Sequence, residues 1–118
     1  MSRRALGIQG EQMAAQILEM KGYRILERNY RCRFGEVDIV AESEGEMVFV
    51  EVKTRSTDNF GRPAEAVTLE KLERMQRVAG YYVFLHHLSG VNVRFDVVEV
   101  YFTSLKMRAR HLENVVQL

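Results

Sequence analysis

The sequence contains one cysteine and no long apolar run. A single thiol, Cys32, excludes an internal disulfide framework and a cysteine-rich zinc site, and it favours a reducing, cytoplasmic location. A membrane-spanning helix needs about 18 consecutive apolar residues, and no stretch here approaches that length. The basic N-terminus leads directly into charged sequence, so we expect neither a signal peptide nor a membrane partner.

The sequence also lacks the composition of a disordered chain, because 47% of its residues are hydrophobic and its formal net charge is only +1. It has no repeat, no low-complexity tract and no linker. A chain of 118 residues is long enough to bury one core. We therefore expect residues 1–118 to form a single domain.

The small net charge conceals an uneven distribution. Residues 1–35 carry seven Lys and Arg against three Glu, and residues 36–51 carry six acidic residues with no basic residue. The remaining residues carry ten basic side chains against seven acidic ones. An acidic centre between basic flanks differs from the even mixing of a plain soluble surface. Composition alone favours a solvated acidic hairpin. Whether the acids instead form a functional cluster depends on the direction in which their side chains point.

Apolar spacing predicts two helices and four strands. The helices span residues 8–21, where Gly22 is a suitable stop, and residue 68 to about 88, where Thr68 can cap the start. The expected strands are residues 23–31, 36–43, 47–54 and 91–97. A loop is expected at 56–63, and a short helix or docking segment at 103–118. The order is α-β-β-β-α-β, an α/β fold with a right-handed crossover from the third strand to the fourth.

The second and third strands form a predicted hairpin that concentrates charge. A two-residue turn at 44–45 places Asp38 opposite Glu51 and Glu36 opposite Lys53, with directly opposed side chains on one face. A turn shifted by one residue would instead place Asp38 opposite Lys53, still on that face. A three-residue loop would break the alignment, so the inference depends on the turn.

The third strand is apolar on both faces next to these charges, which is typical of a strand covered on both sides. A buried Glu or Lys there is costly unless it is paired or bound to a metal. Lys53 can neutralise one acid but not Asp38, Glu51 and Glu36 together. A divalent cation can, and Mg²⁺ binds one or two carboxylates together with waters and substrate phosphates.

Glu11 allows two interpretations. It lies three residues before Ala14 and seven before Leu18, at the edge of the buried stripe of the first helix. One interpretation is a first-turn Glu that favours the helix dipole. The other is a fourth acidic group directed at the sheet, beside the hairpin acids.

A carboxylate–metal site beside an ammonium group suits hydrolysis of a phosphodiester. The metal polarises a phosphoryl oxygen and lowers the pKa of bound water. Lys53 would orient the nucleophile or stabilise the charge that develops in the transition state. The basic flanks would hold the polyanion. The alternative is a nucleic-acid-binding or scaffold domain without turnover, in which the acids form an internal ion-pair network around Lys53.

These residues carry a resemblance to a known family. Asp38, followed by Glu51-Val52-Lys53 at the end of an apolar strand, resembles the PD-(D/E)XK nuclease motif, although Val37 stands where the Pro of that name would be. Longer strings resemble the YraN-like group of bacterial proteins, which is similar to archaeal Holliday junction resolvases. They are Gly10-Glu11, FGEVDIV at 34–40, VFVEVKTR at 48–55 and RFDVV at 94–98.

The resemblance implies a restriction-endonuclease-like fold with a mixed central sheet flanked by helices. It also implies a Mg²⁺- or Mn²⁺-dependent endonuclease acting on DNA, with branched or structured DNA as the expected substrate. Asp38 and Glu51 would ligate the metal, with the carbonyl of Val52 as a third ligand. Lys53 would be the catalytic lysine, and Glu11 an outer contact to metal or water.

Nucleic-acid contacts are expected from two places. The resemblance implies a phosphate contact at Arg55, beside the site. In the first strand, basic residues alternate with aromatic ones, which suits backbone contact plus base stacking, although the aromatics could equally be core. The candidate contacts are Arg28 and Arg31 in that strand and Arg33 just after it.

The remaining charged and apolar groups have less specific interpretations. The second helix carries a basic face of Lys71, Arg74 and Arg77, interpreted first as solvated and second as a stripe facing DNA. Asp96 is expected to pair with an Arg, and His111 to be solvated. Related resolvases act as dimers, and the apolar C-terminal end suits either a homodimer interface or a cover for its own sheet. It consists of Leu112, Val115, Val116 and Leu118.

Overall fold

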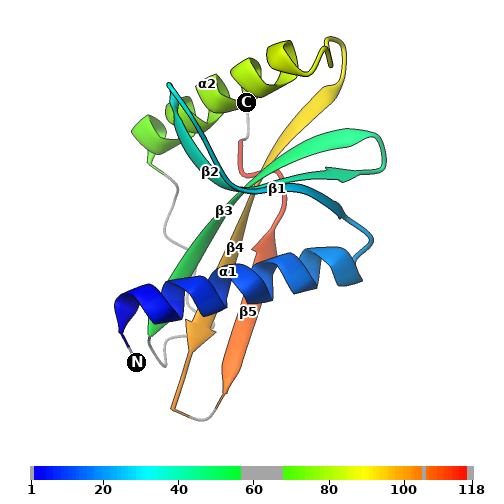
Figure 1. Cartoon of the computed structure of the whole chain (residues 1–118). Helices are drawn as coiled ribbons and strands as arrows, with labels where there is room; N and C mark the ends of the chain where they lie inside the picture. Colours follow the sequence, from blue (N-terminus) through cyan, green and yellow to red (C-terminus); the bar gives the residue numbers. More distant parts are fainter. Residues whose placement is uncertain (1, 57–67, 105, 117–118) are drawn as a thin grey trace.

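The computed structural model describes residues 2–56, 68–104 and 106–116. These residues form a five-stranded sheet in the order β1-β2-β3-β4-β5 and two helices (Figure 1). The elements are α1 (Arg3–Met20), β1 (Arg24–Cys32), β2 (Gly35–Ser43), β3 (Glu46–Ser56), α2 (Leu69–Leu85), β4 (Asn92–Phe102) and β5 (Met107–Leu112).

The sheet is mixed. Strand β2 is antiparallel to both β1 and β3, β3 and β4 are parallel, and β5 is antiparallel to β4. Helix α2 lies in the connection between the two parallel strands, as parallel pairing requires a long crossover. The predicted α-β-β-β-α-β core and the mixed sheet with flanking helices are therefore confirmed.

Each helix packs on one face of the sheet. Alternate residues of β3 enter two separate apolar clusters, Val48 and Val50 with α1, and Met47 and Phe49 with α2. In Figure 1, α1 crosses the sheet well away from α2, which runs along the far end of β2. The apolar run of β3 is thus covered on both sides, as its sequence predicts.

The helix boundaries follow from their caps. Ser2 caps α1, its Oγ accepting a hydrogen bond from Ala5 N–H at 3.1 Å, so the helix begins five residues earlier than expected. Gly22, with φ +92°, follows its end as predicted. Thr68 caps α2 as predicted, accepting from Lys71 N–H at 3.1 Å.

The hairpin turn is the two-residue turn on which the site prediction depends. Ser43 pairs with Glu46, and Glu44 and Gly45 have φ values of +51° and +81°. Two central residues with positive φ are the conformation that matches the twist of a hairpin. The predicted loop at 56–63 begins with Ser56, the last residue of β3, and its remainder lies outside the described residues.

The C-terminal segment corrects one expectation. Residues 107–112 form strand β5 and not a short helix, because the edge of β4 offers unpaired backbone groups that this segment satisfies. Beyond it, Val115 N–H donates to the carbonyl of Phe95 at 2.8 Å, and Val115 and Val116 pack against the cluster beneath α2. The described part of this apolar end covers its own sheet.

A buried polar network joins β4 to β5. Arg94 Nε donates to Asp96 Oδ1 at 3.0 Å, which confirms the predicted Arg partner of Asp96. The prediction that His111 is solvated is wrong, since its side chain is 2% exposed and its Nε2 lies 2.8 Å from Asp96 Oδ2. The pairing of the unexpected strand β5 with β4 is what buries this histidine.

No helix in the described part of the chain has the length and apolar character needed to span a bilayer.

Candidate active site

Asp38 and Glu51 meet where strands β2 and β3 separate. The paired residues run from Ser43 and Glu46 to Ile39 and Val50, so Asp38 and Glu51 follow directly after the last pair. There Asp38 Oδ2 accepts a hydrogen bond from the backbone N–H of Val52 at 2.8 Å. A side-chain carboxylate therefore takes the β3 donor that regular pairing would have used, and it is held beside Glu51.

The two carboxylates lie in a site where burial raises the pKa of both. Burial raises the pKa of Asp38, against the opposing effects of the Val52 N–H and the charge of Lys71. Burial and then the negative charge of Asp38 raise the pKa of Glu51. A half-buried acid pair with raised pKa values is stabilised by a nearby cation, because the cation offsets the cost of burial and the repulsion between the two carboxylates.

Helix α2 contributes a cation that the sequence analysis did not assign to the site. Lys71 Nζ lies 2.5 Å from Glu51 Oε1, and the Glu51 side chain is only 12% exposed. Lys71 stands four residues before Met75, which is buried on the sheet-facing side of α2. This i,i+4 spacing was the available signal, since it extends the buried stripe by one turn.

Glu11 comes to the site from α1. Because α1 begins at Arg3, Glu11 is not in the first turn, and its interpretation as a first-turn dipole residue is wrong. Burial and then the charge of Asp38 raise its pKa, and a side-chain hydrogen bond from Asn29 opposes that rise. Glu11 therefore lies close enough to Asp38 for their charges to interact, which favours its second interpretation.

Close packing of α1 on β3 brings Glu11 there. A Cβ built on Gly10 would lie 2.1 Å from Thr54 Oγ1, so only glycine allows this approach. Asn29 completes the contact from β1. Its neighbours Arg28 and Tyr30 pair with Ile39 and Val37, which places Asn29 across from Asp38, and its φ is +53°. The role of Asn29 is not recognisable from the sequence, because nothing in its surroundings indicates left-handed backbone within a strand.

Lys53 lies two residues beyond Glu51 on the same strand. Its positive charge opposes the rise in the pKa of Glu51, after the larger effects of burial, Asp38 and Lys71. In the register with β4 it stands beside Glu99, which is fully buried. Arg55, half-buried, follows one alternation later and stands beside Tyr101. Lys53 and Arg55 thus extend the line of charge begun by Glu51.

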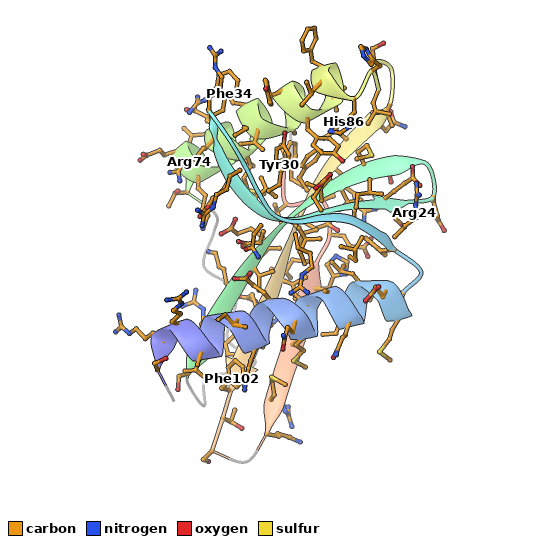
Figure 2. All side chains as sticks on the ribbon, in the orientation of Figure 1. Arg24, Tyr30, Phe34, Arg74, His86 and Phe102 are labelled. Carbon is orange, nitrogen blue, oxygen red and sulfur yellow. The ribbon has the colours of Figure 1, made fainter. Side chains whose placement is uncertain are left out.

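The three candidate arginines lie along the hairpin of β1 and β2, Arg28 and Arg31 in β1 and Arg33 in the turn that follows it. The charge of Arg28 acts on Glu11, Arg31 Nε lies 2.9 Å from Glu36 Oε2, and Arg33 lies over the ring of Phe34 at 5.0 Å. Only Arg28 reaches the acidic site. Figure 2 shows Phe34 and Arg74 at the same end of the molecule, where the hairpin meets α2.

The aromatic residues near these arginines in the sequence pack within the protein. Tyr23 belongs to the cluster beneath α1, and Tyr30 and Phe34 pack against the one beneath α2. Their rings make edge contacts, Tyr30 with Tyr82 at 5.1 Å and Phe34 with Tyr81 at 5.7 Å. The sequence allowed these aromatic residues to stack on bases or to belong to the core, and their packing is that of core residues.

The donor set fits a divalent cation that keeps several waters. Within residues 2–56, 68–104 and 106–116, no three His, Cys, Asp or Glu side chains are grouped closely enough to hold a metal by themselves. Mg²⁺ does not need such a group, because one or two carboxylates plus water and phosphate complete its shell. Asp38 and Glu51 supply the two carboxylates, and the Val52 N–H holds the Asp38 carboxylate in place beside Glu51.

Comparison with known proteins gives a consistent match. The profile of the uncharacterised protein family UPF0102 matches residues 10–100. The chain belongs to this family. A UPF0102 protein of Moorella thermoacetica is 52% identical over 101 residues, covering 86% of this chain and 84% of the relative. One from Caldicellulosiruptor saccharolyticus is 50% identical over 101 residues, covering 86% of each chain.

The matched region of UPF0102 contains the whole candidate site and ends before β5. The resemblance to the YraN-like group is confirmed by this membership. Among solved structures, SfsA of Pyrococcus furiosus in complex with Ca²⁺ is similar, with a TM-score of 0.44 and 17% identity. The alignment covers 98% of this chain but only 65% of SfsA, so this chain spans less than two-thirds of that protein.

Proposed function

We propose that this UPF0102 chain is a metal-dependent nuclease that hydrolyses phosphodiester bonds in DNA, with branched or structured DNA as its substrate. The observation that carries the proposal is the meeting of two half-buried carboxylates, Asp38 and Glu51, close enough to Lys53 for its charge to act on Glu51. Such an arrangement is costly to fold and suits a cation and a phosphate.

Asp38 and Glu51 would hold a Mg²⁺ or Mn²⁺ ion, together with the carbonyl of Val52. When bound, such an ion polarises a phosphoryl oxygen and acidifies water. The hydrogen bond from Val52 N–H fixes the orientation of the Asp38 carboxylate before any ligand arrives. Preorganised ligands of this kind avoid a reorganisation cost during the reaction.

Lys53 and Glu11 act around the reacting phosphate. The Lys53 ammonium donates hydrogen bonds to the attacking water or to the phosphate oxygens as negative charge builds on them. Glu11, held by Asn29, accepts a hydrogen bond from water at the outer side of the site. Arg55, Arg28, Arg31 and Arg33 contact flanking phosphates.

A second candidate function is a nucleic-acid-binding or scaffold domain that does not cleave. The ion pair of Lys71 with Glu51 favours it, because this contact already neutralises one of the two acids without any metal. In that case the acids and lysines are a structural network. The two functions differ in whether divalent cations change the protein and its substrate.

A cleavage assay separates them. Labelled four-way junction, flap, duplex and single-stranded DNA are incubated with Mn²⁺ and either the wild-type chain or Asp38→Asn, whose amide oxygen can still accept from Val52 N–H. We expect cleavage by the wild type alone, and the preferred form defines the substrate. Binding without cleavage by both proteins would support the non-catalytic domain instead.

A further inference from the structure

Lys71 contacts Glu51, the carboxylate that a metal ion at this site would bind. Its Nζ lies 2.5 Å from Glu51 Oε1, and its charge also acts on Asp38. The backbone of Lys71 is fixed by the helix start, since Thr68 Oγ1 accepts its N–H at 3.1 Å. The side chain is 35% exposed, so its charged end reaches both the buried acid and solvent.

A divalent cation and the Lys71 ammonium group compete for the negative charge of Glu51. A cation bound between Asp38 and Glu51 shields the charge that holds the ammonium group, and the ion pair loses its advantage. Lysine suits an exchange of partners, because it is a compact charge on a flexible four-carbon stem and binds phosphate as readily as carboxylate.

Lys53 is placed differently. It lies on β3 itself, in register with Glu99 of β4, whose buried carboxylate pairs with Arg110 Nε at 3.3 Å. Lys71 instead approaches from a helix on the covering layer, and its ion-pair partner is the expected metal ligand itself. The two lysines therefore have distinct roles.

We infer that Lys71 exchanges partners at the site. In the metal-free protein it neutralises Glu51, and when a divalent cation takes over that carboxylate, the ammonium group turns to a phosphate of the bound nucleic acid. This inference rests on the proposed function, since it assumes that Glu51 is a metal ligand. It makes Lys71 both a competitor of the metal and a contact to the substrate.

The test measures Mn²⁺ affinity by titration without DNA, and DNA cleavage separately. Lys71→Met keeps the stem and removes the charge. Arg77→Met is the matched control, because Arg77 is an exposed cation six residues further along α2. Lys71→Arg keeps a positive charge at the site. Thermal unfolding without metal shows that each variant is folded.

We expect Lys71→Met to bind Mn²⁺ more tightly than the wild type, by about tenfold for a partly buried ion pair, while cleaving DNA more slowly. Arg77→Met should match the wild-type Mn²⁺ affinity, and Lys71→Arg should bind Mn²⁺ no more tightly than the wild type. Equal or weaker Mn²⁺ binding by Lys71→Met overturns the inference, even if the wild type cleaves DNA.

The remaining outcomes separate this inference from the proposed function. Tighter Mn²⁺ binding by Lys71→Met without cleavage by any protein leaves the exchange at Glu51 standing and removes the nuclease and the phosphate contact. If neither the wild type nor Lys71→Met binds Mn²⁺, both proposals are wrong. In that case the contact of Lys71 with Glu51 is a structural ion pair.

Discussion

Asp38 Oδ2 accepts the backbone N–H of Val52 at 2.8 Å, across the point where β2 and β3 separate. This contact joins the register of the sheet to the geometry of the candidate site. Because the carboxylate replaces a backbone acceptor, the strands can part without leaving the Val52 donor unsatisfied. The same bond holds Asp38 beside Glu51, where repulsion would otherwise drive the two carboxylates apart.

Substitution of Asp38 separates its structural and ligand roles. Asp38→Asn keeps an acceptor for Val52 N–H and should fold with little loss of stability, whereas Asp38→Ala removes the acceptor and should cost about 1–2 kcal/mol. The wild type should gain about 2.7 kcal/mol at Mn²⁺ concentrations a hundredfold above Kd, and both variants should lose that gain. Chemical denaturation with and without Mn²⁺ measures each value. An undiminished gain in Asp38→Asn would show that the metal binds elsewhere.

Asn29 is expected to position Glu11. Asn29→Gly keeps the left-handed backbone and removes the side chain, so the free energy of unfolding should change by less than about 1 kcal/mol. Cleavage should fall by about tenfold, as is usual for the loss of an outer contact at a metal site. The control is Asn114→Gly, a residue of similar φ, +51°, outside the site. Equal cleavage by Asn29→Gly and the control would show that Asn29 does not position Glu11 for the reaction.

Two glycines of α1 should respond oppositely to alanine. Gly10→Ala places a methyl group against Thr54 Oγ1, which forces α1 away from β3 and should cost about 1–3 kcal/mol. Gly7→Ala meets no atom within 4 Å and should stabilise the helix by about 0.5–1 kcal/mol. Denaturant unfolding of both variants tests the close approach. A stable Gly10→Ala variant would mean that α1 is not pressed against β3 there.

Asp96 should make the fold sensitive to acid. Burial acts to raise its pKa, but hydrogen bonds from His111, Arg94 and the N–H of Asn114 outweigh it and hold the pKa below its ordinary value. A lowered pKa stabilises the fold above the unfolded value, near pH 4, and this stability is lost as the pH falls through the folded value. Acid titration of unfolding free energy should therefore fall more steeply in the wild type than in Asp96→Asn. Parallel curves would contradict this.

The sequence alone predicted the hairpin acids because they depend on local rules. A two-residue turn at 44–45 fixes the register, and the register places Asp38 beside Glu51. It did not predict Lys71 at the site, because that contact depends on how α2 lies over the sheet. The spacing from Lys71 to Met75 indicates the buried side of the helix but not the strand beneath it.

Strand β5 was missed for a related reason. Residues 107–112 carry Arg108, Arg110 and His111, so their apolar alternation is weak and gives no clear strand signal. The segment pairs because β4 presents a free edge, which is a property of the assembled sheet and not of the segment. The burial of His111 followed from that pairing, and it was missed with it.

The most direct test of the account is Lys53→Ala, because it separates metal binding from chemistry. Mn²⁺ affinity and cleavage of the preferred DNA form are measured on the same preparations of wild type and variant. We predict Mn²⁺ binding close to that of the wild type and a loss of cleavage by about a hundredfold or more. Cleavage at the wild-type rate by Lys53→Ala would contradict the assignment of this site as a nuclease centre.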